Sequence, residues 1–171
     1  MPDVNGSKAE VMAVKSFRTW VTLGVAGAVL ATGAMFIGSD GATAAGADKT
    51  IAYRKMVMGA TGAHIGAIAS VVKGETGYAA HVGDHARALA GLARMMPDIF
   101  PEGSGEGDTR AKPEIWQDWP RFTAAAKALE TAAMDLAMKA DSGDMAAIGA
   151  GLGAVGKSCG GCHEPFRKPA R

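Results

Sequence analysis

Two cysteines and a histidine lie close together near the C-terminus, in the stretch Cys159-Gly160-Gly161-Cys162-His163. If the stretch is helical, these three side chains share one side of the helix, because residues three and four positions apart are neighbours on a helix surface. Two thiols at this spacing can form thioether bonds to the two vinyl groups of a porphyrin, and the adjoining imidazole can bind its iron. The motif therefore predicts one covalent haem c, attached at Cys159 and Cys162, with His163 as the proximal iron ligand.

Other uses of a Cys-x-x-Cys pair explain less of this motif. A zinc site needs four ligands, and the chain has 2 cysteines, so zinc would have to recruit histidines from distant segments. A thioredoxin-like redox pair follows a strand, whereas the residues before Cys159 have a helical pattern. A disulfide gives no reason for the adjoining histidine. A non-haem module with zinc or a disulfide at the two cysteines stays as an alternative.

The N-terminal region has the features of an export signal. Lys15 and Arg18 precede an apolar run at residues 20–37, and small residues at 42–47 offer cleavage sites. This run is a little shorter than the roughly 20 residues that span a bilayer, so an uncleaved anchor is the less favoured alternative. We expect a cleaved signal peptide at residues 1–47, a periplasmic mature chain at residues 48–171, and no stable membrane anchor after cleavage.

The beginning of this leader is unusual for a signal peptide. It carries Asp3 and Glu10 ahead of the apolar run, a region that is ordinarily positively charged. Translation from Met12 would give a leader of ordinary length and charge. We therefore treat Met12 as an alternative true start.

Charge gives little information on partners. The chain has 18 Lys and Arg residues against 17 Asp and Glu residues, a formal net charge of +1. Proteins that bind nucleic acid carry a clustered basic surface, which this balance does not indicate. We expect no nucleic-acid partner, and the sequence leaves the redox partner proteins unknown.

Four segments have apolar residues at helical spacing, which predicts four amphipathic helices. The repeated positions are Ile51, Met58, Ile65, Ile68 and Val72 in the first segment; Val82, His85, Leu89, Leu92 and Met96 in the second; Phe122, Leu129 and Leu136 in the third; and Leu152, Val155, Cys159, Cys162 and Phe166 in the fourth. A shared seven-residue repeat predicts an all-α fold, an antiparallel left-handed four-helix bundle. Both cysteines fall on the apolar stripe, so we expect the haem inside the bundle, near the C-terminus. We interpret the long connection at residues 97–119 as a crossover loop.

Two residues of the first segment have side chains that suggest further haem contacts. Arg54 lies on the apolar stripe, where an unpaired charge is costly, and a haem propionate would pair with it; the alternative is that its side chain extends to solvent. Met58 lies one turn further on and is a candidate second axial ligand, although methionine at such a position often only packs in the core.

Histidines elsewhere are weaker candidates for the second axial position. His85 lies on the stripe of the second segment, four residues after His81, and His64 lies in the first segment. None of them has the register of Met58. We therefore expect core or haem-edge histidines here, with a bis-histidine haem as the rival interpretation.

The mature part resembles the cytochrome c′ family, the class II c-type cytochromes. Besides the haem motif, the family pattern is present in Tyr53-Arg54, Val72-Lys73-Gly74-Glu75, Phe100-Pro101-Glu102-Gly103, Ile115-Trp116 with Phe122, and Phe166-Arg167. The haem motif near the C-terminus is also typical of this family.

The resemblance implies roles for residues around the haem. It implies that Arg54 lies near a propionate, Arg167 on the proximal side and Met58 at the distal position. Family members divide there into five-coordinate, high-spin proteins that bind carbon monoxide or nitric oxide and low-spin proteins with a ligating methionine. Met58 favours the low-spin, methionine-ligated cytochrome c-556 type, so we expect an electron carrier with His163 and Met58 as axial ligands, and no enzyme. The alternative is the high-spin gas-binding type.

A homodimer is a further expectation, because dimers are common in this family. Gly59, Gly62 and Gly66 in the first segment would let a flat ring or another helix come close to the backbone. We expect these glycines near the haem or at a subunit contact, and close packing between helices within the bundle is the alternative.

Overall fold

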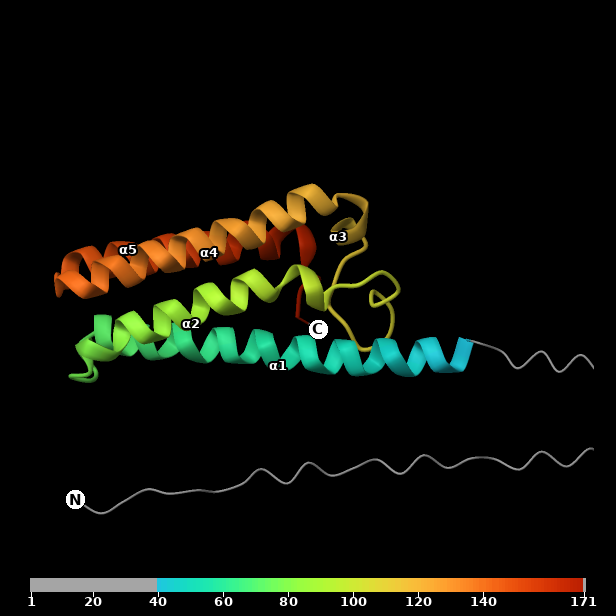
Figure 1. The fold of residues 1–171 in the computed structure, drawn as a ribbon, viewed down its shortest axis with the longest axis horizontal. Coiled ribbons are helices and arrows are strands. Elements are labelled where there is room, and N and C mark those ends of the chain that lie inside the picture. Colours follow the sequence, from blue (N-terminus) through green and yellow to red (C-terminus); the bar gives the residue numbers. More distant parts are fainter. Residues whose placement is uncertain (1–39, 171) are drawn as a thin grey trace, which may run out of the picture. The chain divides into compact units, whose positions relative to one another are not determined.

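A computed structural model describes residues 40–170, and the fold of these residues is a bundle of four long helices (Figure 1). Within this range there is no strand; a single antiparallel bridge joins Ala111 and Arg167. The predicted all-α bundle is confirmed. The helices are α1 (Asp40–Val72), α2 (Val82–Met95), α3 (Glu114–Gln117), α4 (Trp119–Ser142) and α5 (Met145–Phe166), with 3₁₀ turns η1 (Ala79–His81) and η2 (Pro97–Ile99).

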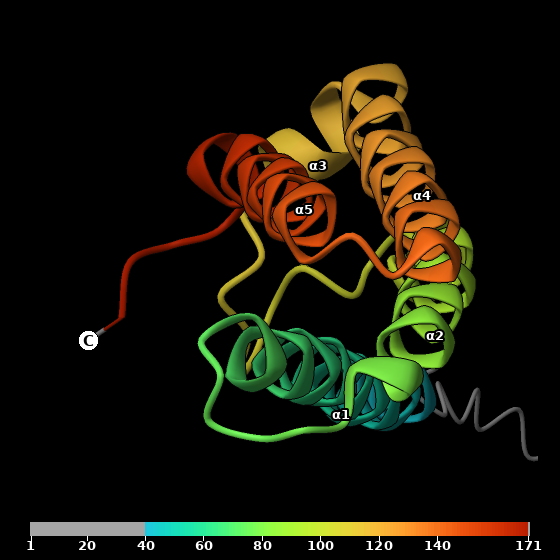
Figure 2. The same cartoon turned by 90° about the vertical axis from the view of Figure 1, so that its left-hand side faces the viewer.

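A tight turn makes α4 and α5 antiparallel neighbours (Figure 2). Gly143 ends α4 with φ of 72°, a conformation that glycine adopts without steric cost. Asp144 then begins α5, where its carboxylate accepts hydrogen bonds from the backbone N–H groups of Ala146 at 2.9 Å and Ala147 at 3.2 Å. This cap satisfies two backbone N–H donors that have no partner within the helix. The haem motif lies at the opposite end of α5.

Two apolar clusters fill the interior. The main core lies between α2, α4, α5 and the second half of α1, and includes Ile68, Val82, Leu89, Leu129, Leu136, Ile148 and Val155. The aromatic cluster lies at the end of the bundle that holds the haem motif, and consists of Val57, Ile99, Phe100, Ala111, Ile115, Phe122 and Phe166. Cys159 packs against the main core, Cys162 packs against the aromatic cluster, and Met58 packs against both.

The predicted apolar stripes are largely those that the structure buries. Phe122 and Leu136 of α4 are buried as predicted. In α1 the buried positions are shifted: Val57 and Val71 are buried, whereas Met58 is only partly buried. The shift arises because the face of α1 that carries Met58 lines a cavity, described below, and its neighbouring face contacts the clusters.

Two features of α1 bear on the predicted signal peptide. Residues 1–39 lie outside the described range, so most of the predicted leader is untested, and the predicted cleavage site at residues 42–47 falls within the first turns of α1. From Gly46 to Val72 the helix is long and apolar enough to cross a membrane by length and composition. Ile51 and Ile68 are buried against the rest of the bundle, while 22% of this apolar window is buried.

Candidate functional site

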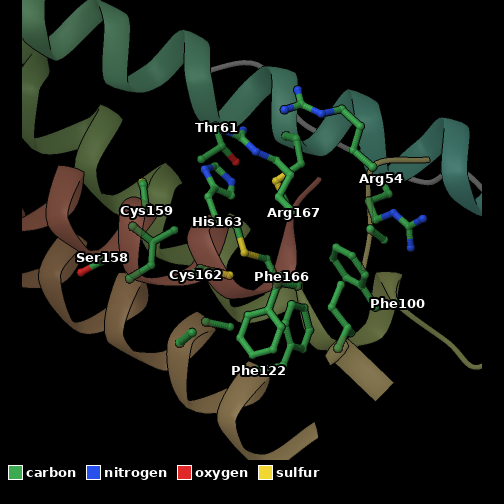
Figure 3. A pocket seen from close by; sticks show the side chains of 18 of the residues that line it. Arg54, Thr61, Phe100, Phe122, Ser158, Cys159, Cys162, His163, Phe166 and Arg167 are labelled. Carbon is green, nitrogen blue, oxygen red and sulfur yellow. The ribbon is translucent and has the colours of Figure 1, made fainter. Parts of the chain in front are cut away.

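The haem motif lies on the last two turns of α5 and opens onto a cavity of about 430 Å³ (Figure 3). Cys159, Cys162 and His163 all line it, as their spacing predicts. Ligand cavities in proteins commonly have volumes of roughly 300–1,000 Å³. The structure therefore places both thiols and the imidazole on one wall of a ligand-sized space.

The other walls come from α1, α2, α4 and the crossover loop. They include Met58, Thr61, Gly62 and Ile65 of α1, Met96 at the end of α2, Phe122, Ala125, Ala126 and Leu129 of α4, and Phe100, Ala111 and Ile115 of the loop region. Cations line part of the cavity, at Arg54, Lys55, Arg110 and Arg167, and no carboxylate is among its described lining residues. Apolar walls with positive charge at one side, facing two thiols and an imidazole, fit a porphyrin with two anionic propionates.

The two cysteines are free thiols in this arrangement, with no disulfide between them. Burial raises the pKa of Cys162 to about 11, and Cys159 adds to the shift, while Arg167 opposes it. Burial likewise raises the pKa of Cys159. Both thiols are therefore protonated near neutral pH. Residues 40–170 also contain no group of three or more His, Cys, Asp and Glu side chains able to hold a metal ion, so the zinc alternative finds no support there.

The surroundings of His163 favour its neutral imidazole form. Burial is the main cause of its lowered pKa, and the positive charges of Arg167 and Arg110 lower it further. A neutral imidazole keeps a lone pair that can bind iron. The same arginine stabilises the end of α5, because the Arg167 backbone N–H donates to the His163 carbonyl at 3.0 Å. These surroundings favour the protonation state that the predicted proximal ligand needs.

Arg54 is 4% exposed and bonds to the crossover loop. Its Nη1 donates to the Ser104 hydroxyl at 3.1 Å and the Ile99 carbonyl at 3.4 Å, and its Nη2 donates to the Ser104 carbonyl at 2.8 Å and the Thr109 hydroxyl at 2.9 Å. The guanidinium also lies 4.3 Å from the centre of the Phe100 ring. These four acceptors are uncharged, and burial lowers the pKa of Arg54.

The contacts of Arg54 add a role that the sequence did not predict. They tie α1 to a loop some fifty residues further along the chain, whereas the sequence suggested only a propionate or solvent. Solvent is excluded by the burial of the side chain. A propionate contact remains a prediction, and Arg54 lines the cavity where such a contact would form.

Met58 lines the cavity, whereas the three histidines proposed as rival ligands do not. Met58 lines the cavity on the α1 side, as expected for a distal residue. His64, His81 and His85 are absent from the cavity lining; His64 and His85 instead contact each other, with 2.8 Å between their Nδ1 atoms. The rival bis-histidine haem therefore has no support from this geometry.

A clamp between the crossover loop and the C-terminal tail completes the proximal side. The Lys112 N–H donates to the Phe166 carbonyl at 3.0 Å, and the Lys168 N–H donates to the Arg110 carbonyl at 2.8 Å. The Arg110 Nε returns a bond to the Lys168 carbonyl at 2.9 Å. This pairing places Arg110 and Arg167 at the cavity. The sequence did not predict the pairing, because no local pattern indicates which loop the C-terminal tail will contact.

Glycines close to the cavity are only partly as expected. Gly62 lines the cavity, whereas Gly59 and Gly66 do not. All three glycines are exposed and have open space where a Cβ would lie. A role of Gly59 and Gly66 at a subunit contact stays a prediction.

Comparisons with known proteins agree with this geometry. A family model described as Cytochrome C′ matches residues 49–167. A cytochrome c′ of Rhodospirillum rubrum is 41% identical over 118 residues, which cover 68% of this chain and 80% of the relative. A cytochrome c-556 of Agrobacterium fabrum is 34% identical over 137 residues, 80% of this chain and 92% of the relative.

Solved structures share the fold. A nitric oxide complex of a mutant cytochrome c prime from Alcaligenes xylosoxidans superposes with a TM-score of 0.66 at 31% identity, covering 72% of this chain and 97% of the other. The cytochrome c′ of Thermochromatium tepidum gives a TM-score of 0.67 at 28% identity with the same coverage.

Proposed function

This chain belongs to the cytochrome c′ family, and from that premise we propose that it binds a diatomic gas, nitric oxide or carbon monoxide, at a haem c whose distal position is open. The haem supplies an iron that changes oxidation state and can take up a small ligand. Cys159 and Cys162 hold it covalently, and His163 provides the proximal ligand. The proposal reverses the preference that Met58 alone suggested, because several close relatives are named cytochrome c′ and one solved relative holds nitric oxide.

The observation that carries the proposal is the composition of the cavity wall on α1. Opposite the haem motif this wall presents Met58, Thr61, Gly62 and Ile65. The Thr61 hydroxyl donates to the Val57 carbonyl at 2.9 Å, so its proton is used within the helix. Met58 packs against both apolar clusters, as a side chain that fills space does. This wall gives a largely apolar distal side, which suits a small uncharged ligand.

A second candidate function is electron transfer with His163 and Met58 as axial ligands. It is favoured by the position of Met58 on the cavity wall and by the relative named cytochrome c-556. Saturated coordination suits an electron carrier, because the iron then changes charge with little change of ligand geometry. In this alternative Met58 gives up part of its packing to hold the distal position.

The other roles that we propose follow from the same family. Arg167 stabilises the proximal side, Arg54 contacts a propionate while holding the loop, and the protein turns over no substrate. We propose that the chain is exported to the periplasm and exchanges electrons with partner proteins there. A homodimer through α1, where Tyr53 and Met56 are exposed, is part of the proposal.

Carbon monoxide binding to the ferrous holoprotein tests the two functions against each other. If Met58 only fills space, the rate of carbon monoxide binding to the wild type should rise linearly with carbon monoxide concentration, since no ligand has to leave first. A wild-type rate that levels off at high carbon monoxide concentration, and that becomes linear in Met58→Ala, would support the electron carrier. Met56→Ala is the matched control, because Met56 lies on the same helix, is 64% exposed and does not line the cavity.

A further inference from the structure

His64 of α1 and His85 of α2 meet between the two helices, and neither is among the residues that line the haem cavity. Their Nδ1 atoms are 2.8 Å apart, and their ring centres are 5.1 Å apart with an angle of 59° between the planes. Both side chains are partly buried. Helices α1 and α2 run side by side here (Figures 1 and 2), so two imidazole nitrogens from distant parts of the chain converge on one point.

The distance between the two Nδ1 atoms is compatible with two ligand atoms bound to one metal ion. Two ligand atoms about 2.0 Å from a metal ion and 90° apart lie about 2.8 Å from each other, whereas a tetrahedral angle places them about 3.3 Å apart. The 2.8 Å between the Nδ1 atoms is the length of a hydrogen bond between the two rings, and two nitrogens this close are also compatible with neighbouring positions of a square-planar or octahedral ion. Cu²⁺ prefers that geometry and binds imidazole more strongly than other divalent ions of the first transition row.

We propose that His64 and His85 form a binding site for a divalent transition-metal ion, with Cu²⁺ as the preferred ion, that links α1 to α2. In the metal-free pair one Nδ1–H donates to the lone pair of the other Nδ1. On binding, the proton of the donor ring moves to its Nε2 by exchange with water, both rings stay neutral, and both Nδ1 lone pairs bind the ion. No net proton is released, and no redox change occurs.

The surroundings define what kind of site this is. Residues 40–170 hold no group of three or more His, Cys, Asp and Glu side chains positioned for a metal, so water completes the coordination. The site is therefore an open, exchangeable one rather than a closed structural one. His81 lies one turn before His85, but its ring stacks on Tyr78 with centres 5.2 Å apart and its side chain is exposed.

Titration of the haem-loaded protein with Cu²⁺ tests the proposal, because the thioether bonds then keep both cysteines from binding copper. Calorimetry should show one site in the wild type, and His64→Gln and His85→Gln should each weaken it by about tenfold or more. His81→Gln is the matched control and should bind as the wild type does. Copper bound with unchanged affinity in both His64→Gln and His85→Gln, at the N-terminal amine for example, would overturn the proposal.

A measurement on the unaltered protein avoids any dependence on how the variants fold. With one equivalent of Cu²⁺, electron paramagnetic resonance should show splitting from two imidazole nitrogens, and the splitting should change when the histidines are labelled with ¹⁵N. Paramagnetic broadening of amide signals should be strongest around residues 64 and 85. Splitting from one or no imidazole, or broadening centred elsewhere, would contradict the site.

Discussion

Arg54 is the residue whose contacts do most to shape the end of the cavity. It is buried, donates four hydrogen bonds to the loop at residues 99–109 and lies over the Phe100 ring. A buried guanidinium is stable only when its donors are satisfied, so the loop and the arginine depend on each other. The neighbouring Lys55 pairs with Asp108 at 2.5 Å but is half exposed, so its charge is screened by water.

Replacing Arg54 separates its contact with the loop from its predicted contact with a propionate. Arg54→Ala should lower the free energy of unfolding by about 1 to 3 kcal/mol, because buried loop acceptors lose their donors. If a propionate is also bound, the reduction potential should shift, and Arg54→Lys should restore part of the potential but little of the stability. Thermal unfolding and potentiometry measure the two effects.

Lys55→Ala is the control for the stability measurement only, because Lys55 also lines the cavity and its exposed ion pair contributes about 0–1 kcal/mol. A potential that stays unchanged in Arg54→Ala would remove the propionate role and leave the loop role. A stability equal to that of the wild type would contradict the loop role.

At the scale of elements, close packing between α4 and α5 fixes the wall that carries the haem motif. Gly151 of α5 is buried, and a Cβ there would lie 2.9 Å from Leu136 Cδ1 and 3.2 Å from Lys139 Cδ. The two helices approach closely at this point because a side chain is missing. Gly153, two residues further along α5, has open space instead.

These two glycines should respond to alanine in opposite directions. Gly151→Ala forces side chains apart, and overpacking costs about 1 to 3 kcal/mol, which exceeds the gain of about 1 kcal/mol in helix propensity. Gly153→Ala should raise stability by about 0.5–1 kcal/mol. Denaturant unfolding of the holoproteins measures both changes. A Gly151→Ala variant as stable as Gly153→Ala would show that α4 and α5 can separate without cost.

The helices themselves were predictable, because their signal is local. Phe122, Leu129 and Leu136 repeat every seven residues and are all buried on α4, and the haem motif lies on its helix as its spacing requires. The contacts of Arg54 with Ser104 and Thr109 were not predictable, since they join residues about fifty positions apart. The choice between Met58 as a ligand and Met58 as a filler also depends on packing that spacing does not encode.

For the whole molecule, the predicted leader and the bundle meet within α1. The helix begins at Asp40, upstream of the predicted cleavage site, and Ile51 is the first of its side chains described as buried. Cleavage after Ala47 therefore removes residues that precede Ile51, the first side chain of α1 that is described as buried. The bundle and its cavity should remain as they are in the uncleaved chain.

Export should yield a mature chain that begins near Ala45 or Asp48. Intact mass and N-terminal sequencing of periplasmic material identify the start, and the mature holoprotein should unfold at the same temperature as the uncleaved holoprotein, because the residues of the two apolar clusters all lie after Ala47. Translation from Met12 should still support export. A membrane-bound product that retains residues 20–37 would overturn the prediction, and loss of export on deletion of residues 1–11 would refute the start at Met12.

The spin state of the iron in native holoprotein tests the central claim most directly, since that claim combines a covalent haem with an open distal side. Absorption and electron paramagnetic resonance spectra of the purified protein near neutral pH should show a high-spin, five-coordinate iron with His163 as the axial ligand. Met58→Ala should leave that spin state unchanged. A low-spin spectrum in both oxidation states that becomes high-spin in Met58→Ala would contradict the gas-binding account and establish Met58 as the sixth ligand.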